Sequence, residues 1–290
     1  MTTEPDQLPL PAAQEPPALA KPPKTRRRDA AGRRHRSLAL AITLDVVLLV
    51  VLLGSWQFAV DSGSVSGLLY GSPGQIWHTI VGGVESGTMF SDAGATALEA
   101  LLGFVIGNLI GATIGVALWY SRLVEQMLRP AIAFLGATPV AALAPMIIVW
   151  VGTGMISKIV VSAASVVVTA LVLAFQGARG TDPLQIRLLR SMGAPTRRVF
   201  RLLVLPSSLV NICGGLRLTA GLALVGAIIG EFISSSSGLG HAILIAGSLY
   251  DISTVLANLL VVGLLALVLL GAIGRVERVI LRWRFLALSE

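Results

Sequence analysis

The sequence predicts an all-α protein that crosses a membrane about six times. Of its 290 residues, 54% are hydrophobic and only 13% are charged, whereas a soluble domain carries about 25% charged residues. The mean hydropathy is +0.82. Apolar segments recur at about the 20-residue length that a helix needs to cross roughly 30 Å of hydrocarbon. Because lipid offers no hydrogen bonds to the backbone, we expect these segments to be helices.

The chain starts with a polar tail. Residues 1–37 are rich in Pro and Ala and then strongly basic, a composition that cannot bury enough apolar surface to fold alone, so we expect disorder. The basic cluster either contacts anionic lipid headgroups or only orients the chain. Residues 38–93 are expected to hold the first span and an external loop, 94–275 the transmembrane core, and 276–290 a short C-terminal tail.

Six apolar segments follow the tail. They lie near 38–60, 94–119, 131–151, 158–177, 205–230 and 253–274. The third contains Pro139 and Pro145, which membrane helices tolerate when neighbours satisfy the freed carbonyls. In the second, a glycine recurs at every fourth position from 103 to 115. Such a stripe lets another helix approach closely, either within the chain or from a second copy.

The distribution of basic residues predicts the orientation. With six spans, 20 of the 22 Lys and Arg residues fall on one side, in the two tails and in the loops 120–130 and 178–204. The positive-inside rule makes that side cytoplasmic. Both termini and the 178–204 loop are therefore expected in the cytoplasm.

A short helix with defined ends is expected in the 178–204 loop. Asp182 can cap the first amide groups, and Pro183 fits the first helical position. Gly193 suits a left-handed closing residue, and Pro195 prevents continuation. A second short helix is expected to begin at Thr196 and lead into the fifth span.

The first of these helices carries an apolar stripe. Leu184, Leu188 and Met192 are spaced four residues apart, and Leu189 widens the stripe. Arg187 lies beside it. An exposed stripe of this kind fits either a groove on a partner protein or the surface of the lipid headgroups.

The same loop resembles a known motif. The stretch DPLQIRLLRSMGAPTRRVFRLLVLP is similar to the cytoplasmic EAA loop of bacterial ABC importer permeases, with Asp182, Pro183, Gly193, Leu205 and Pro206 in register. The stretches LRPAIAFLGATPVAALAPMIIVWVGTG and GGLRLTAGLALVGAIIGEFISSSSGLG resemble permeases for nitrate, sulfonate, taurine and related solutes. The resemblance covers roughly residues 65–285.

The resemblance implies a type I ABC importer permease fold in a bacterial cell membrane. Five core spans and one added first span would form each subunit, and two subunits, usually identical, would form the pathway. A separate ATPase would hydrolyse ATP, and an external binding protein would deliver the solute. The permease itself would be neither an enzyme nor dependent on a cofactor.

Residues of the loop would then couple the membrane helices to the ATPase. The expected coupling residues are Asp182, Pro183, Arg187, Leu188, Leu189, Met192, Gly193 and Thr196. The sequence departs from the motif where the Glu and the two Ala residues of E-A-A become Arg187, Leu188 and Leu189. A basic and bulky surface replaces an acidic and small one, so either the ATPase has a wider groove to suit it or the coupling is weak.

Several polar residues fall within or near the spans. Arg217 could pair with an anionic solute such as a sulfonate, or it could bond to carbonyls or to a carboxylate on a neighbouring helix. Glu231 is interpreted as a residue of the outer mouth, the alternative being a carboxylate in the wet interface. Lys158 is expected to extend from a span end to the interface. Cys213 lies in an apolar segment without other metal-ligating residues beside it, so its side chain is expected to pack against apolar neighbours.

Other function classes find less support. The sequence has no phosphate-cradling GxxxxGK[ST] loop, no paired His/Glu helix motif and no nucleophile elbow. A secondary transporter or channel that works without an ATPase remains the alternative, although no convincing inverted repeat is visible. The basic charge lies mainly in tails and loops, which makes nucleic-acid binding a poor interpretation. The resemblance implies a small solute, such as a sulfonate, nitrate, taurine or a related molecule, and the sequence does not predict which one.

Overall fold

The computed structural model describes residues 24–286, with side chains described from 43 to 280. The chain divides into two units, 1–55 and 56–290. The first unit contains most of helix α1 (Lys24–Asp61), whose segment Thr43–Asp61 is long and apolar enough to cross a membrane. The helix begins before the boundary at 37 that the sequence predicts, and residues 1–23 of the predicted tail lie outside the described residues.

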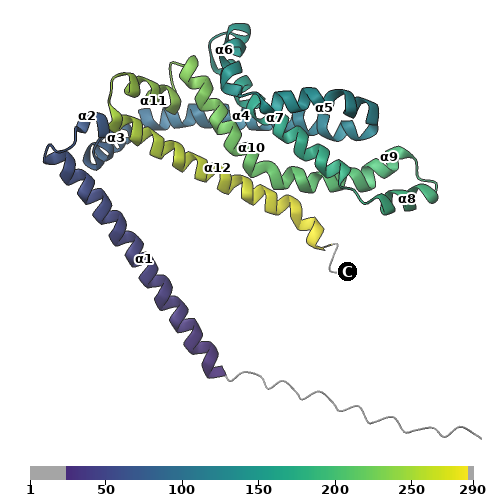
Figure 1. Cartoon of the computed structure of the whole chain (residues 1–290), viewed down its shortest axis with the longest axis horizontal. Helices are drawn as coiled ribbons and strands as arrows, with labels where there is room; N and C mark the ends of the chain where they lie inside the picture. Colours follow the sequence, from purple (N-terminus) through teal and green to yellow (C-terminus); the bar gives the residue numbers. More distant parts are fainter. Residues whose placement is uncertain (1–23, 287–290) are drawn as a thin grey trace, which may run out of the picture. The chain divides into compact units, whose positions relative to one another are not determined.

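The second unit consists of helices and their connections (Figure 1). They are α2 (Gly67–Tyr70), α3 (Pro73–Glu85), α4 (Thr88–Ala117), η1 (Leu118–Tyr120), α5 (Arg122–Ala137), α6 (Val140–Val151), α7 (Met155–Arg179), α8 (Pro183–Ser191), α9 (Thr196–Val199), η2 (Phe200–Val204), α10 (Leu205–Ile233), α11 (Leu239–Ser248) and α12 (Ile252–Leu286). Within the described residues, five helical stretches are long and apolar enough to span a membrane, and a bent pair of helices brings the number to six. The all-α fold with about six spans is therefore confirmed.

The third predicted span differs from a straight helix. Instead of one segment at 131–151, α5 and α6 meet at an angle of 97°. Thr138, between them, has an extended backbone with φ −80° and ψ 122°. A residue before proline is pushed out of the helical region, and Pro139 has no amide hydrogen to continue the helix. The proline that the sequence shows as an interruption therefore ends one helix and starts another.

The glycine stripe of α4 packs against α7 of the same chain. A Cβ atom at Gly111 would lie 2.3 Å from the carbonyl oxygen of Val167, and one at Gly115 would lie 2.2 Å from that of Leu171. These distances leave no space for a side chain. The stripe therefore serves helix packing within the subunit, which settles a choice that the sequence leaves open.

Helix α10 completes a three-helix centre with α4 and α7 (Figure 1). The hydroxyl of Ser162 on α7 donates to the carbonyl oxygen of Ala223 on α10 at 2.8 Å. An apolar cluster then joins α4, α10, α11 and α12 through Ala100, Leu224, Ala227, Leu239 and Val262. This centre fixes the positions of both ends of α7 and of α10. The candidate functional residues lie at these ends.

Candidate functional site

The connection between α7 and α10 forms the short helix that the sequence predicts. Oδ1 of Asp182 accepts a hydrogen bond from the amide of Leu184 at 2.8 Å, and Pro183 is the first residue of α8. Gly193 closes the helix with φ +81°. The predicted start of a second helix at Thr196 is also confirmed, because α9 begins there.

The apolar stripe of α8 is exposed. The side chains of Leu184, Leu188 and Met192 are 68%, 61% and 74% exposed. Leu189 is half-buried, so it adds less to the exposed stripe than the sequence predicts. Arg187 is exposed. Three large apolar side chains of α8 are thus exposed. The helix packs mainly against α9. It lies at one end of the second unit, beyond α7 and α10 (Figure 1).

The base of this loop is anchored more firmly than its tip. Val199 and Val204 are fully buried, and the ring centroid of Phe200 lies 4.7 Å from that of Tyr120 in η1, the turn that follows α4. The turn η2 is π-helical, a geometry that often occurs at functional sites. An ion pair between Arg179 and Glu125 also ties the end of α7 to α5. The connection between α8 and α10 is therefore packed against the rest of the second unit.

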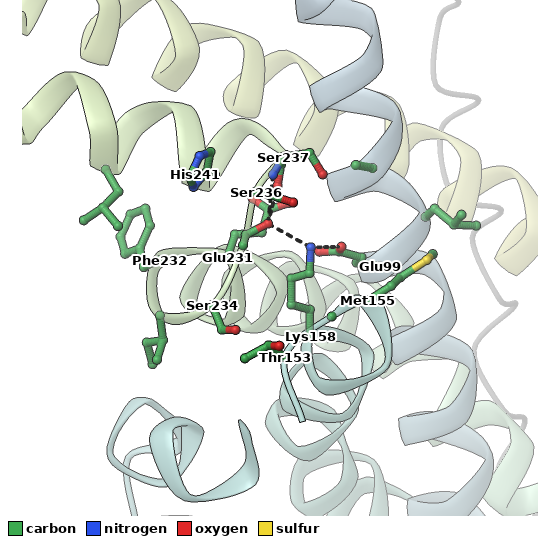
Figure 2. Close-up of a pocket in the computed structure, with 16 residues that line it drawn as sticks. Glu99, Thr153, Met155, Lys158, Glu231, Phe232, Ser234, Ser236, Ser237 and His241 are labelled. Carbon is green, nitrogen blue, oxygen red and sulfur yellow. Dashed lines mark hydrogen bonds and ion pairs between the residues drawn. The ribbon is translucent and has the colours of Figure 1, made fainter. Parts of the chain in front are cut away.

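A cavity lined by both polar and apolar side chains lies toward the opposite ends of α7 and α10. The 25 residues of α7 make it about 37 Å long, so this cavity is distant from α8. Its volume is about 680 Å³. Its lining comes from α4, α7, α10, α11 and the serine-rich connection 234–237 (Figure 2).

An ion pair is buried at the wall of this cavity. Nζ of Lys158 on α7 lies 2.6 Å from Oε1 of Glu99 on α4, and it donates to the hydroxyl of Ser235 at 2.9 Å (Figure 2). Lys158 is only 5% exposed and Glu99 only 1%. The expectation that Lys158 extends to the interface is wrong, because the Glu99 carboxylate gives its ammonium group a partner inside the fold.

Glu231 lies beside this pair and holds the next connection in place. It is fully buried, and it accepts hydrogen bonds from Oγ1 of Thr96 at 2.7 Å and from the amide of Gly240 at 2.6 Å. The amide of Gly238 donates to Oδ1 of Asp92 at 2.8 Å. Glu231 does line the cavity, but its carboxylate is bonded to α4 and to the start of α11 rather than lying in a wet interface.

Sequence reasoning did not identify the contributions of Asp92, Thr96 and Glu99 as a group. They share one helical stripe near the start of α4, spaced by four and three residues. That spacing is the available signal, because residues so spaced lie on one face of a helix. Their partners on α7, α10 and α11 are far away in sequence and were not predictable from it.

Arg217 on α10 pairs with a carboxylate on a neighbouring helix. Its Nε lies 3.0 Å from Oε2 of Glu277 on α12, and its side chain is 58% exposed. A Cβ atom at Gly274 would lie 3.0 Å from the guanidinium, so the glycine makes room for the arginine. This ion pair favours the structural interpretation of Arg217, with Glu277 as the carboxylate on a neighbouring helix.

The described residues contain no group of three or more His, Cys, Asp or Glu side chains that could hold a metal ion. Cys213 is buried in α10, as expected for a packing residue.

The chain is similar to known proteins of one family. Residues 90–282 match the family model of the binding-protein-dependent transport system inner membrane component. A putative aliphatic sulfonates transport permease of Bacillus subtilis (strain 168) is 28% identical over 87% of this chain and 90% of its own length. The riboflavin transport system permease RibX of Chloroflexus aurantiacus is 32% identical, with 84% and 90% covered. The taurine transport system permease TauC of Escherichia coli (strain K12) is 27% identical, with 85% and 91% covered.

A solved structure supports the same fold. A chain of the MetNI methionine ABC transporter in an inward-facing conformation superposes with a TM-score of 0.59 at 18% identity, covering 66% of this chain and 95% of that one. The family match begins in α4 and ends in α12, so it includes both the cavity and the α8 loop. The chain therefore belongs to the family of binding-protein-dependent transport system inner membrane components, as a multi-pass ABC permease subunit and not as an enzyme.

Proposed function

We propose that the chain is the permease subunit of a bacterial ABC importer in which two copies form the pathway. A separate ATPase binds on the cytoplasmic side, and an external binding protein delivers a small solute. The family supports the need for an ATPase and a binding protein. The loop carries the same capped helix that the EAA motif implies.

The observation that carries this proposal is the exposed apolar stripe of α8. Apolar side chains that face water cost free energy, about 1.5–3 kcal/mol for a leucine relative to burial. A partner groove that covers Leu184, Leu188 and Met192 recovers this free energy. The anchored base of the loop then carries movement of the partner into α10.

We place α8 and both termini in the cytoplasm, and the cavity toward the outside. The support is the distribution of positive charge, with 20 of 22 Lys and Arg residues on the α8 side of the spans. In this orientation the ATPase meets α8, and the binding protein meets the end that contains α11 and the serine-rich connection.

The solute is proposed only as a small molecule. Relatives are named for aliphatic sulfonates, riboflavin, taurine and formylaminopyrimidine. The sulfonate and taurine relatives support an anionic group on the solute. The riboflavin and formylaminopyrimidine relatives are named for solutes of other classes, so the proposal goes no further than a small molecule.

The direct test is reconstitution of the chain in proteoliposomes with the ATPase encoded beside it. We expect the two proteins to co-purify, and we expect ATP hydrolysis to rise when the matching binding protein and its solute are present. Solute uptake that proceeds at the same rate without any ATPase would instead support a secondary transporter or channel.

A further inference from the structure

We propose that Glu99 and Glu231 hold one proton between them, and that this proton keeps the connection 234–238 bound to the helices beside the cavity. The proton lies on Oε2 of Glu99 and is donated to the carboxylate of Glu231. Its loss at higher pH releases the connection. The inference concerns this chain alone and does not depend on which solute the chain carries.

The two carboxyl groups meet because three helices approach closely at this point. A Cβ atom at Gly230 on α10 would lie 3.1 Å from Cα of Lys158 on α7, so Glu231, the next residue, lies near α7. Thr96 and Glu99 are about one helical turn apart on α4, and Thr96 donates to Oε1 of Glu231. The Glu99 carboxyl lies within hydrogen-bond reach of the Glu231 carboxyl, and both side chains are buried.

The hydrogen bonds of the two carboxyl groups leave one oxygen that can carry a proton. Oε1 of Glu99 lies 2.6 Å from Nζ of Lys158. Oε1 and Oε2 of Glu231 accept from the hydroxyl of Thr96 and the amide of Gly240. Oε2 of Glu99 is buried and receives no N–H or O–H donor from the described residues. Since two carboxyl groups can form a hydrogen bond only when one of them is protonated, this oxygen is the one that donates.

The charges around the pair require the same proton. Two ionised carboxylates beside Lys158 would leave one negative charge uncompensated in a buried site, which is costly. With one proton, the charges of Lys158 and Glu231 balance. The other titratable side chains that face the pair are Asp92 on α4, which accepts from an amide of the connection, and His241 on α11, which lines the cavity (Figure 2). The sequences of α6, of α12 up to residue 274 and of the connection contain none.

The proton matters to the connection because this pair holds both of its ends. Glu231 accepts from the amide of Gly240, and Lys158 donates to the hydroxyl of Ser235. A Cβ atom at Gly238 would clash with the Glu231 carboxyl, so the connection lies directly against it. When the proton leaves, the two carboxylates repel each other and compete for the ammonium group, which weakens both contacts. In the orientation proposed above, the external pH then sets how firmly the connection is held, and this step alone rests on the proposed function.

The test measures amide hydrogen exchange of the connection in the full chain, in lipid nanodiscs, between about pH 6 and about pH 9. Exchange is expressed as a protection factor, which removes the pH dependence of the exchange chemistry itself. The reporters are the amides of Gly238, Leu239 and Gly240, which donate to side chains of α4 and α10. We expect their protection in the parent to fall at least about tenfold as the pH rises, because like charges in contact favour local opening.

Two glutamine variants should behave in opposite ways. In Glu99→Gln, the amide oxygen can accept from Lys158, and the amide N–H replaces the proton as a permanent donor to Glu231, so we expect high protection at every pH. Glu231→Gln places an amide where both oxygens accept hydrogen bonds, so we expect low protection at every pH. Glu85→Gln, which changes an exposed carboxylate, and His241→Gln should both keep the fall of the parent.

Three results would overturn the proposal. They are protection in the folded parent that does not change with pH, a Glu99→Gln variant that keeps the parent's fall or behaves like Glu231→Gln, and a fall that disappears in His241→Gln, which would assign the titration to the imidazole.

An infrared spectrum of the parent in an ester-free detergent decides the question if Glu99→Gln does not fold. A carboxylic-acid carbonyl band that is present at neutral pH and lost at high pH supports the shared proton, whereas carboxylate bands alone would overturn it. Each of these results is scored without the ATPase. Failure of the proposed function would appear instead as a failure to co-purify with the ATPase, so the two failures are distinguishable.

Discussion

The two ends of α7 and α10 differ in which kinds of side chain are exposed and which are buried. At the α8 end, large apolar side chains face outward, with Leu184 at 68% and Met192 at 74% exposed. At the cavity end, charged side chains are buried, with Glu231 at 0% and Lys158 at 5%. Exposed apolar side chains are costly unless a partner protein covers them, and buried charged side chains are costly unless they are paired. We expect the cavity end to be rigid and α8 to be more flexible, because hydrogen bonds between helices cross-link the cavity end but not α8.

The largest expected effect is on accessibility. In a Cys213→Ala background, Ser191→Cys at the end of α8 and Ser236→Cys at the cavity should be labelled by an impermeant maleimide from opposite faces of the membrane. Both serines are exposed, and the native cysteine is buried. We expect all-or-none labelling in right-side-out and inverted vesicles. Labelling of both positions from one face would contradict the six-span topology.

The next effect is on stability at the centre that joins the two ends. Gly111→Ala places a Cβ atom 2.3 Å from the carbonyl of Val167, so α4 and α7 must separate. We expect a loss of about 1–3 kcal/mol, or failure to fold. Gly94→Ala in the same helix is the matched control, because nothing lies within 4 Å of its Cβ position. Thermal unfolding of the two purified variants, followed by fluorescence, should show a lower midpoint for the first alone.

The buried end should depend on Glu231 for its structure. Glu231→Ala leaves the Gly240 amide without its acceptor and leaves the Thr96 hydroxyl only the carbonyl oxygen of Asp92 as an acceptor. We expect a loss of about 1–3 kcal/mol because the Gly240 amide stays buried and unpaired. The connection 234–238 should then become more susceptible to protease. Glu85→Ala changes an exposed carboxylate and should leave both readouts unchanged. Unchanged protection in the Glu231 variant would show that this end is held by other contacts.

A smaller effect is expected at Arg217, which lies between the two ends. Arg217→Ala removes an ion pair with Glu277 whose arginine is more than half exposed, so we expect about 1 kcal/mol or less in stability. We expect expression and assembly to change more than the choice of solute. A variant that assembles like the parent and loses only the transport of anions would place Arg217 on the pathway.

Much of the fold could be predicted because its signals are local. Segment length and hydropathy predict the spans, and Asp182, Pro183 and Gly193 define the ends of α8. The bend at Thr138 and Pro139 was only partly predictable, since a proline in a membrane helix can produce a kink, a break or no change, depending on its neighbours.

The cavity could not be predicted in the same way. Glu99 and Lys158 are isolated charges in the sequence, and what makes them a pair is the close approach of α4 and α7 along the glycine stripe. The stripe itself is visible in the sequence, but its partner is not. The half-burial of Leu189 has a similar cause, because it depends on how α8 rests on α9.

The most direct test of the account is capture of the ATPase by variants of α8. Leu184→Ala combined with Leu188→Ala removes two exposed apolar side chains, each worth about 1.5–3 kcal/mol when buried by a partner, whereas Arg187→Glu changes a charge worth about 1 kcal/mol or less at an exposed site. We expect the double-leucine variant to fold normally, to capture the ATPase at least about tenfold more weakly and to lose coupled ATP hydrolysis, while Arg187→Glu retains most of both at high salt. A double-leucine variant that captures and couples like the parent, beside an Arg187 variant that fails, would contradict it.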